Sequence, residues 1–220
     1  MIMTDGVIFD VDGTLWDSTD IVKDAWNKAF IDCGYPDPGI TADRLKGLFG
    51  LPMKDIITDI FPKGSAEEIE RLTPVIYGYE DEYLQQSGGV LYPRIIETIH
   101  KLSESVPVFI VSNCQEGYVE LFMSKTDSAD YITDHLCPGD TGLLKAGNIT
   151  KIINDHKLSH PVYVGDTVMD RDACDQAGCP FIFAAYGFGR VADCRYVIDA
   201  PDDLLKILEI QTVSMGRFDS

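Results

Sequence analysis

Short apolar runs that end in polar residues recur along the 220-residue chain. The first run, Val7 to Phe9, leads directly into Asp10 and predicts a buried strand. Similar runs predict strands at residues 108–112, 161–165, 180–184 and 196–198, with a short one near residues 131–132. Helical spacing separates them at about 117–123, 149–156 and 202–208, and we expect the tail from Gln211 to fray. Strands alternating with helices predict the α/β class, with a doubly wound parallel sheet.

The alternation is interrupted between residues 17 and 87, where the pattern is helical throughout. Ser18 can cap a helix that runs to about Phe30, and shorter helical segments are expected at 42–48 and 53–60. The stretch therefore predicts an all-helical domain, residues 17–87, inserted into an α/β core made of residues 1–16 and 88–220. Hinges are expected near residues 15–17 and 87–89.

The last part of this insert contains two further helix-start signals. Ser65 and Glu68 have the spacing of a capping box, which predicts a helix from that point. Thr73 precedes Pro74, and proline is favoured in the first turn of a helix. We therefore expect two helices here, the second beginning at Pro74.

Net charge and cysteine usage narrow the classes of partner. The chain has 36 acidic and 18 basic residues, a formal charge of −18, which disfavours nucleic acid and anionic membranes as partners. A small anionic substrate stays compatible, because a local cation can reverse the sign inside one pocket. The six cysteines include no Cys-x-x-Cys and no run approaches the ~18 apolar residues of a membrane helix, so free thiols and a cytoplasmic location are expected.

Asp10 and Asp12 follow the first strand and are expected to point to the same side of it. Burying two carboxylates costs several kcal/mol, roughly, unless a cation or hydrogen bonds hold them. A plain acidic turn is one interpretation. A calcium loop of the EF-hand type is excluded, because Leu15 and Ile21 stand where Gly and Glu are needed.

Polar residues also end the other strands. Ser112 and Asn113 follow one strand, Asp166 follows another with Asp170 four residues on, and Lys145 lies in a predicted loop before a helix. Each alone is typical of a turn, a cap or a solvated side chain. Ligands of open α/β sheets bind at the carboxyl ends of the strands, so the set together predicts one site.

The order Asp10-Val11-Asp12-Gly13-Thr14, Ser112, Lys145 and Asp166 resembles the haloacid dehalogenase-like superfamily of phosphohydrolases. The resemblance implies that Asp10 is the nucleophile, forming an aspartyl-phosphate, and that Asp12 is the general acid and base. Ser112 and Lys145 would bind the phosphoryl group, with Asn113 nearby.

The same resemblance implies a Mg²⁺ cofactor. The Asp10 carboxylate, the Asp12 main-chain carbonyl and Asp166 would hold the ion, while Asp170 would orient Lys145 or a metal-bound water. The departure from the family pattern is Ala146-Gly147 after Lys145, where proline is common; Lys125 and Lys151 are less well placed for the same role.

Within the superfamily, Asp12 distinguishes this chain from the dehalogenases, which lack the second acid. The insert resembles the cap of the phosphoglycolate phosphatase and β-phosphoglucomutase group, where it closes over the pocket. Arg44, Lys46 and Lys54 are cap cations that could meet an anionic leaving group, although solvated helix faces are the plainer interpretation. Gly47 is followed by Leu48, without the Arg turn usual in the mutases, which favours a phosphatase.

The sequence thus predicts a Mg²⁺-dependent phosphatase for a small phosphorylated metabolite, phosphoglycolate-like or a sugar phosphate, as a monomer or weak homodimer. A phosphomutase of the β-phosphoglucomutase type remains the alternative within the superfamily. A non-catalytic phosphate-binding protein or a receiver-like signalling protein is the alternative of another class. The receiver pattern has a contiguous acidic pair and no helical insert, and the motif acids are all present here.

Overall fold

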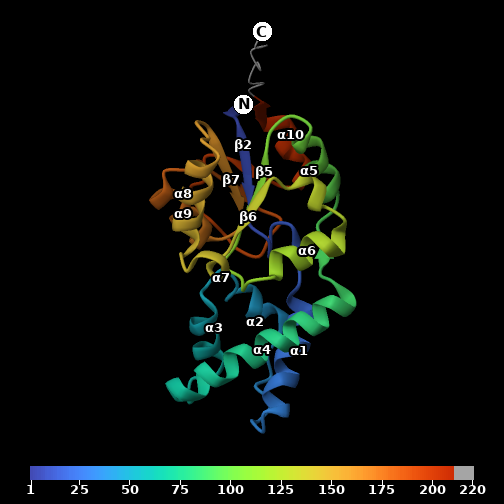
Figure 1. Ribbon diagram of the computed structural model, residues 1–220, viewed down its shortest axis with the longest axis vertical. Coiled ribbons are helices and arrows are strands. Elements are labelled where there is room, and N and C mark those ends of the chain that lie inside the picture. The colour runs from blue at the N-terminus through green and yellow to red at the C-terminus, as the bar shows by residue number, and fades with distance from the viewer. Residues whose placement is uncertain (211–220) are drawn as a thin grey trace, which may run out of the picture.

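A six-stranded parallel sheet forms the centre of the computed structural model, which describes residues 1–210 (Figure 1). The strand order is β6-β5-β2-β7-β8-β9, and every adjacent pair is parallel. The strands are β2 (Gly6–Phe9), β5 (Val108–Val111), β6 (Asp134–Leu136), β7 (Pro161–Gly165), β8 (Phe181–Ala184) and β9 (Val197–Ile198). The predicted doubly wound α/β fold is confirmed.

Helices bury both faces of this sheet (Figure 1). Ile8, Phe109 and Tyr163 point to the face covered by α8 (Lys145–Asp155) and α9 (Val168–Ala177). Val7 and Phe9, one residue to either side of Ile8, point to the opposite face, which is covered by α5 (Ile95–Ser103) and α6 (Tyr118–Thr126). Because both faces are buried, the strands are continuously apolar rather than alternating, which is why they were recognisable as short runs.

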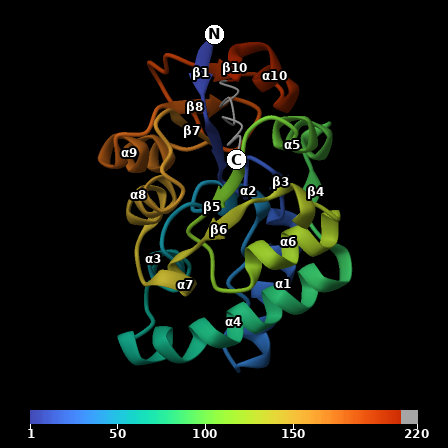
Figure 2. The same cartoon turned by 45° about the horizontal axis from the view of Figure 1, so that its top comes forward.

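Four helices lie beyond the carboxyl edge of the sheet, at the lower end in Figure 1 and around α4 in Figure 2. They are α1 (Thr19–Asp32), α2 (Ala42–Lys46), α3 (Met53–Ile60) and α4 (Ala66–Ser87). The chain enters through β3 (Trp16–Asp17) and leaves through β4 (Val90–Leu91), which pair as an antiparallel ribbon. We therefore keep the proposal of a cap domain, residues 17–87, on a core of residues 1–16 and 88–220.

The remaining elements of the core are short. β1 (Ile2–Thr4) pairs in parallel with β10 (Leu208–Ile210), and α7 (Pro138–Thr141) precedes α8. The predicted helix at 202–208 is a 3-10 turn, Pro201–Asp203, followed by α10 (Leu204–Ile207). The prediction for the tail from Gln211 lies outside the described residues.

The prediction of two helices that meet at Pro74 is wrong, because α4 is continuous through it. The Thr73 hydroxyl donates to the Ile69 carbonyl (2.7 Å) instead of capping a new helix. Pro74 removes one helical hydrogen bond, but α4 packs along α1 with Leu72 and Ile76 fully buried. Tertiary packing here outweighs a local break signal.

Two other boundaries differ from the prediction. Helix α8 begins at Lys145, not near Ile149, and the Asn148 side chain accepts from the Thr141 hydroxyl (2.6 Å) rather than capping a helix. The strand expected near residues 131–132 is a 3-10 turn, and β6 starts at Asp134. The polar residues of β6 masked that strand in the hydrophobic pattern.

All six cysteines are free thiols, as expected. Within residues 1–210, no helix is both long and apolar enough to cross a bilayer.

Candidate active site

Asp10, Ser112 and Asp166 each follow one of three adjacent strands, β2, β5 and β7. From β2 the chain continues to β5 and β6 on one side, then crosses to β7 on the other. The order of the sheet therefore reverses beside β2, where open α/β sheets place their ligands. The predicted convergence of these three residues at one edge is present.

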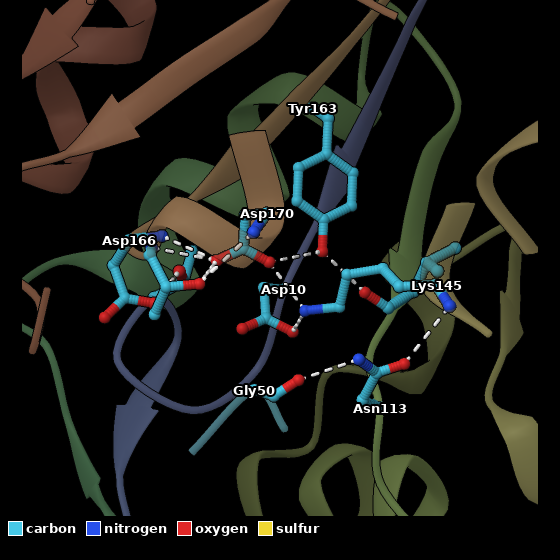
Figure 3. A network of polar contacts seen from close by, with 10 residues as sticks. Asp10, Gly50, Asn113, Lys145, Tyr163, Asp166 and Asp170 are labelled. Carbon is cyan, nitrogen blue, oxygen red and sulfur yellow. Dashed lines mark hydrogen bonds and ion pairs between the residues drawn. The ribbon is translucent and has the colours of Figure 1, made fainter. Parts of the chain in front are cut away.

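Lys145 lies between two carboxylates at the start of α8 (Figure 3). Its ammonium donates to Oδ1 of Asp10 (2.9 Å) and to Oδ1 of Asp170 (2.6 Å), and the residue is only 2% exposed. Burial acts to lower the pKa of Lys145, but Asp10 and Asp170 together raise it above its ordinary value. The cation therefore stays charged inside the site.

Asp170 is held on every side by protein donors. Its Oδ2 accepts from the backbone N–H groups of Asp166 and Thr167 and from the Thr167 hydroxyl (2.6 Å). Its Oδ1 accepts from Lys145 and lies 3.4 Å from the Tyr163 hydroxyl, which donates to the Val111 carbonyl (2.8 Å). Thr167 and Asp170 form the capping box of α9, so the helix start itself fixes this carboxylate. Such an arrangement suits a residue that positions Lys145.

Asp166 is completely buried beneath a tight turn. Its Oδ2 accepts from the Phe188 N–H (2.7 Å), and its Oδ1 lies 3.4 Å from the Thr14 hydroxyl. Gly13 has a φ of +84°, and a Cβ there would lie 2.2 Å from Asp166 Oδ2. The glycine after Asp12 is therefore required by both backbone conformation and space.

Asp10, Asp166 and Asp170 offer oxygens that all lie within 4.8 Å of one another. Burial raises the pKa of Asp10 and of Asp166, and the Lys145 ammonium opposes this at Asp10. Three buried carboxylates face a single ammonium, so the site favours further positive charge. An all-oxygen donor set fits a hard divalent ion such as Mg²⁺. Because the oxygens of Asp170 are engaged by protein donors, Asp10 and Asp166 are the ligands that fit best.

Asp12 has a different environment from Asp10. Its Oδ1 accepts three hydrogen bonds, from Ser18 Oγ (2.5 Å), the Tyr118 hydroxyl (2.8 Å) and Trp16 Nε1 (3.1 Å). Its Oδ2 has no hydrogen-bond partner in the described part of the chain. Burial raises the pKa of Asp12 to about 7, against the opposing hydrogen bonds of Ser18 and Tyr118. Asp12 can therefore gain and lose a proton near neutral pH.

Ser18 is at the N-cap position of α1, as predicted, but it makes no side-chain capping bond. Its hydroxyl is directed to Asp12 instead, while Asp17 Oδ1 accepts from the Thr19 N–H (3.0 Å). A residue expected to have a local structural role therefore contacts the site.

Ser112 and Asn113 follow β5 at the rim of the same cleft. Against the larger effect of burial, the Ser112 side chain acts to lower the pKa of Asp10. Asn113 Oδ1 accepts from the Lys145 N–H (3.1 Å), and its Nδ2 donates to the Gly50 carbonyl (2.8 Å), as Figure 3 shows. The Asn113 amide thus links the first turn of α8 to the loop after α2.

The cleft between the cap helices and the sheet edge contains Asp10, Asp12 and Ser112 on the core side. Its cap side is formed by Trp26, Phe49, Gly50, Leu51, Met53, Ile56, Tyr77 and Glu80. The three cap cations considered from the sequence are not among the lining residues. Arg44 pairs with Asp59 (2.8 Å), Lys46 pairs with Asp17 (2.9 Å), and Lys54 lies at a separate hollow beside Pro74.

Sequence reasoning missed several residues that support the site. Tyr118 and Trp16 donate hydrogen bonds to Asp12, and the Tyr163 hydroxyl lies beside Asp170. These aromatic residues are distant in sequence from the acids or stand in an apolar context, so no local pattern marks them. Thr167 was detectable, because Thr-x-x-Asp before a helix is a capping-box pattern.

The sequence matches the family of haloacid dehalogenase-like hydrolases over residues 7–184. Among curated proteins, it is 26% identical to a phosphoglycolate phosphatase from Vibrio vulnificus, covering 94% of this chain and 96% of that protein. It is 24% identical to one from Rhodobacter capsulatus, over 86% of this chain and 87% of that protein.

Solved structures agree on the fold. A haloacid dehalogenase-like family hydrolase from Streptococcus pneumoniae superposes with a TM-score of 0.80 at 22% identity, covering 91% of this chain and 96% of that one. A predicted phosphoglycolate phosphatase from Haemophilus somnus also has a TM-score of 0.80, at 20% identity, and the match covers 92% of this chain and 97% of that one. The motif order, the sheet topology and the family match lead to one conclusion: the chain belongs to the haloacid dehalogenase-like hydrolases.

Proposed function

We propose that this protein, a phosphatase of the haloacid dehalogenase-like family, hydrolyses a small phosphate monoester through an aspartyl-phosphate on Asp10. The resemblance to the phosphoglycolate phosphatase and β-phosphoglucomutase group suggests phosphoglycolate-like esters and sugar phosphates as substrate classes. The observation that carries the proposal is the pairing of Asp10, bound to Lys145, with Asp12, whose pKa is about 7, in one cleft. Phosphoryl transfer needs both a nucleophile beside positive charge and a proton donor.

Each acid then has a separate task. The Asp10 oxygen that Lys145 does not hold attacks phosphorus, and the bond from phosphorus to the ester oxygen breaks as the alcohol leaves. Protonated Asp12 gives the alcohol its proton. Ionised Asp12 then takes a proton from water, which attacks the aspartyl-phosphate, releases inorganic phosphate and restores Asp10.

Charge on the transferred phosphoryl group is neutralised by preorganised donors. Lys145 supplies a buried ammonium, and Ser112 offers a hydroxyl at the neighbouring strand end. Mg²⁺ held by Asp10, the Asp12 main-chain carbonyl and Asp166 would add positive charge beside the phosphoryl oxygens. Asp170 acts through Lys145, because it touches the ammonium and not the cleft.

The proposed cap, residues 17–87, gives the pocket its outer wall. Because cap and core side chains line the same cleft, closing them together excludes water from the reacting groups. The paired strands β3 and β4 carry both chain crossings side by side, which suits a hinge.

The test is metal-dependent hydrolysis of p-nitrophenyl phosphate by the purified protein. Turnover is expected with Mg²⁺, should stop when EDTA is added, and should return when Mg²⁺ exceeds the chelator. Persistent turnover in excess EDTA would contradict the metal assignment, and absence of turnover with every divalent ion tried would contradict the phosphatase itself.

A further inference from the structure

The cap side of the cleft, across from Asp10, is formed by apolar side chains and acidic groups. Aromatic and aliphatic side chains of the cap form most of it, together with Glu80 of α4. An adjoining outer hollow shares Met53, Tyr77 and Gln115 with the cleft and adds Asp81 and Glu116. Among the described residues, no Lys, Arg or His lines either space.

The acids Glu80 and Asp81 of α4 share one partner, Gln115, which follows β5 on the core side of the cleft. Its Nε2 donates to Glu80 Oε1 (3.2 Å) and to Asp81 Oδ1 (3.3 Å). Glu80 is 4% exposed, and its Oε2 accepts from Trp26 Nε1 (2.7 Å). The side-chain N–H groups of Gln115 and Trp26 therefore donate to carboxylates of the protein, and the Asn113 amide donates to the Gly50 carbonyl. The Tyr77 hydroxyl is the remaining side-chain O–H of the cap side, and it carries no positive charge.

Lys46, one of the cap cations considered from the sequence, is already paired with an acid. The Lys46 ammonium lies 2.9 Å from Asp17 Oδ2 and 5.5 Å from the centre of the Phe188 ring. Its charge is thus balanced by Asp17 before any substrate arrives. Lys145, by contrast, is held at the phosphoryl end by Asp10 and Asp170.

We propose that the alcohol released by this enzyme is uncharged or carries an amine, and that esters with a carboxylate on the leaving group, phosphoglycolate included, are poor substrates. The proposal rests on the phosphatase function above and narrows its substrate class. It separates this chain from the substrate named for its curated relatives, which share only about a quarter of their residues with it.

The size of the effect follows from the charges on the wall. A carboxylate within about 6 Å of one ionised acid in a partly buried site is disfavoured by roughly 100-fold in binding. Burial raises the pKa of Asp81, and it raises the pKa of Glu80 to about 8. Glu80 is therefore about half ionised at pH 8, and the repulsion grows as the pH rises and weakens in acid. A protonated amine on the leaving group would instead be attracted by the same carboxylates.

Three two-carbon esters of matched size test this: 2-phosphoglycolate, 2-hydroxyethyl phosphate and O-phosphoethanolamine. Their kcat/KM values are compared with Mg²⁺ at pH 8, and their Ki values as competitors of p-nitrophenyl phosphate are measured alongside. We expect the neutral and amine esters to exceed phosphoglycolate by at least about 30-fold in kcat/KM or in 1/Ki.

The double variant Glu80→Gln, Asp81→Asn removes two carboxylates and keeps the shape of both side chains. We expect it to lower the preference for the neutral ester over phosphoglycolate, in kcat/KM or 1/Ki, by about fivefold or more. Glu82→Gln is the matched control, because Glu82 is an exposed acid on the same helix and bonds Gln86 instead of the cleft. Its ratio should equal that of the parent.

The outcomes distinguish failure of the proposed substrate preference from failure of the phosphatase function on which it rests. Phosphoglycolate within threefold of the neutral ester, or preferred over it, overturns the inference while leaving the phosphatase intact. Equal or absent inhibition by all three esters also overturns it. Loss of p-nitrophenyl phosphate hydrolysis in the parent protein removes the phosphatase function itself.

Discussion

The Lys145 ammonium lies 2.6 Å from Oδ1 of Asp170, a carboxylate whose other oxygen closes the capping box of α9. The start of one helix therefore fixes the cation at the start of another, α8. An ammonium held from behind in this way has little freedom to move, so its distance to Asp10 is set before substrate binds.

Asp170→Asn is expected to lower kcat by about 10- to 100-fold, with a smaller change in KM, because Lys145 loses the charge that positions it. The measurement is steady-state hydrolysis of p-nitrophenyl phosphate by the folded variant. Asp175→Asn, an exposed acid on the same helix, is the control and should behave as the parent. Equal kcat for Asp170→Asn and the control would remove the positioning role.

Asp10→Asn is expected to leave a folded protein whose turnover is reduced by roughly three orders of magnitude or more, because the covalent route is lost. Stopped-reaction phosphate assays measure it. Beryllofluoride bound at Asp10 in the parent protein would mimic the acyl phosphate, and the variant should not bind it. A fully active Asp10→Asn protein would exclude the nucleophile assignment.

Hydrolysis of alkyl esters is expected to fall as pH rises above about 7, because Asp12 must be protonated to donate and its pKa is about 7. The decline should approach tenfold per pH unit, roughly, for an alkyl ester. p-Nitrophenyl phosphate, whose leaving group is a stable anion, should show a flatter profile. Profiles that coincide for both esters would contradict Asp12 as the general acid.

Glu80 is expected to make folding stability depend on pH. Its pKa is raised from 4.5 to about 8, chiefly by burial, so the folded state favours the neutral acid. Below about pH 4.5 Glu80 is neutral in both the folded and the unfolded protein, and its contribution to the free energy of unfolding is fully present. That contribution is lost as the pH rises through about 8.

Glu80→Gln imitates the neutral acid. At pH 8 its free energy of unfolding should therefore exceed that of the parent by up to about 4 kcal/mol, whereas at pH 4.5 the two should be equal. Urea titrations at several pH values give the comparison. A difference that does not grow with pH would show that Glu80 titrates normally.

The fold and the catalytic core were largely predictable because both are encoded in short stretches. Buried parallel strands are apolar runs, and Asp10, Asp166 and Ser112 stand directly after them. Family membership, an enzyme of this superfamily and the doubly wound sheet are confirmed. The metal, the roles of the site residues and the domain bounds stay proposals.

The rest depends on contacts between distant segments. The Glu80 environment joins α4 to Trp26 and Gln115, which are 54 and 35 residues away in sequence. Pro74 looked like a helix start because a local signal was weighed without the packing of α4 on α1. The pairing of Lys46 with Asp17 likewise could not be seen along the chain, although it decides which charges remain for a substrate.

The unbroken course of α4 gives the cap a mechanical property. The helix has 22 residues and ends beside the paired strands β3 and β4. At about 1.5 Å per residue, a rotation of about 10° at that ribbon, across the helix axis, would carry its far end by roughly 5 Å but Glu80 by under about 2 Å. For the proposed cap, residues 17–87, we therefore expect such a rotation to move the rim far enough to admit a substrate, while Glu80 and its neighbours on the cleft stay almost in place.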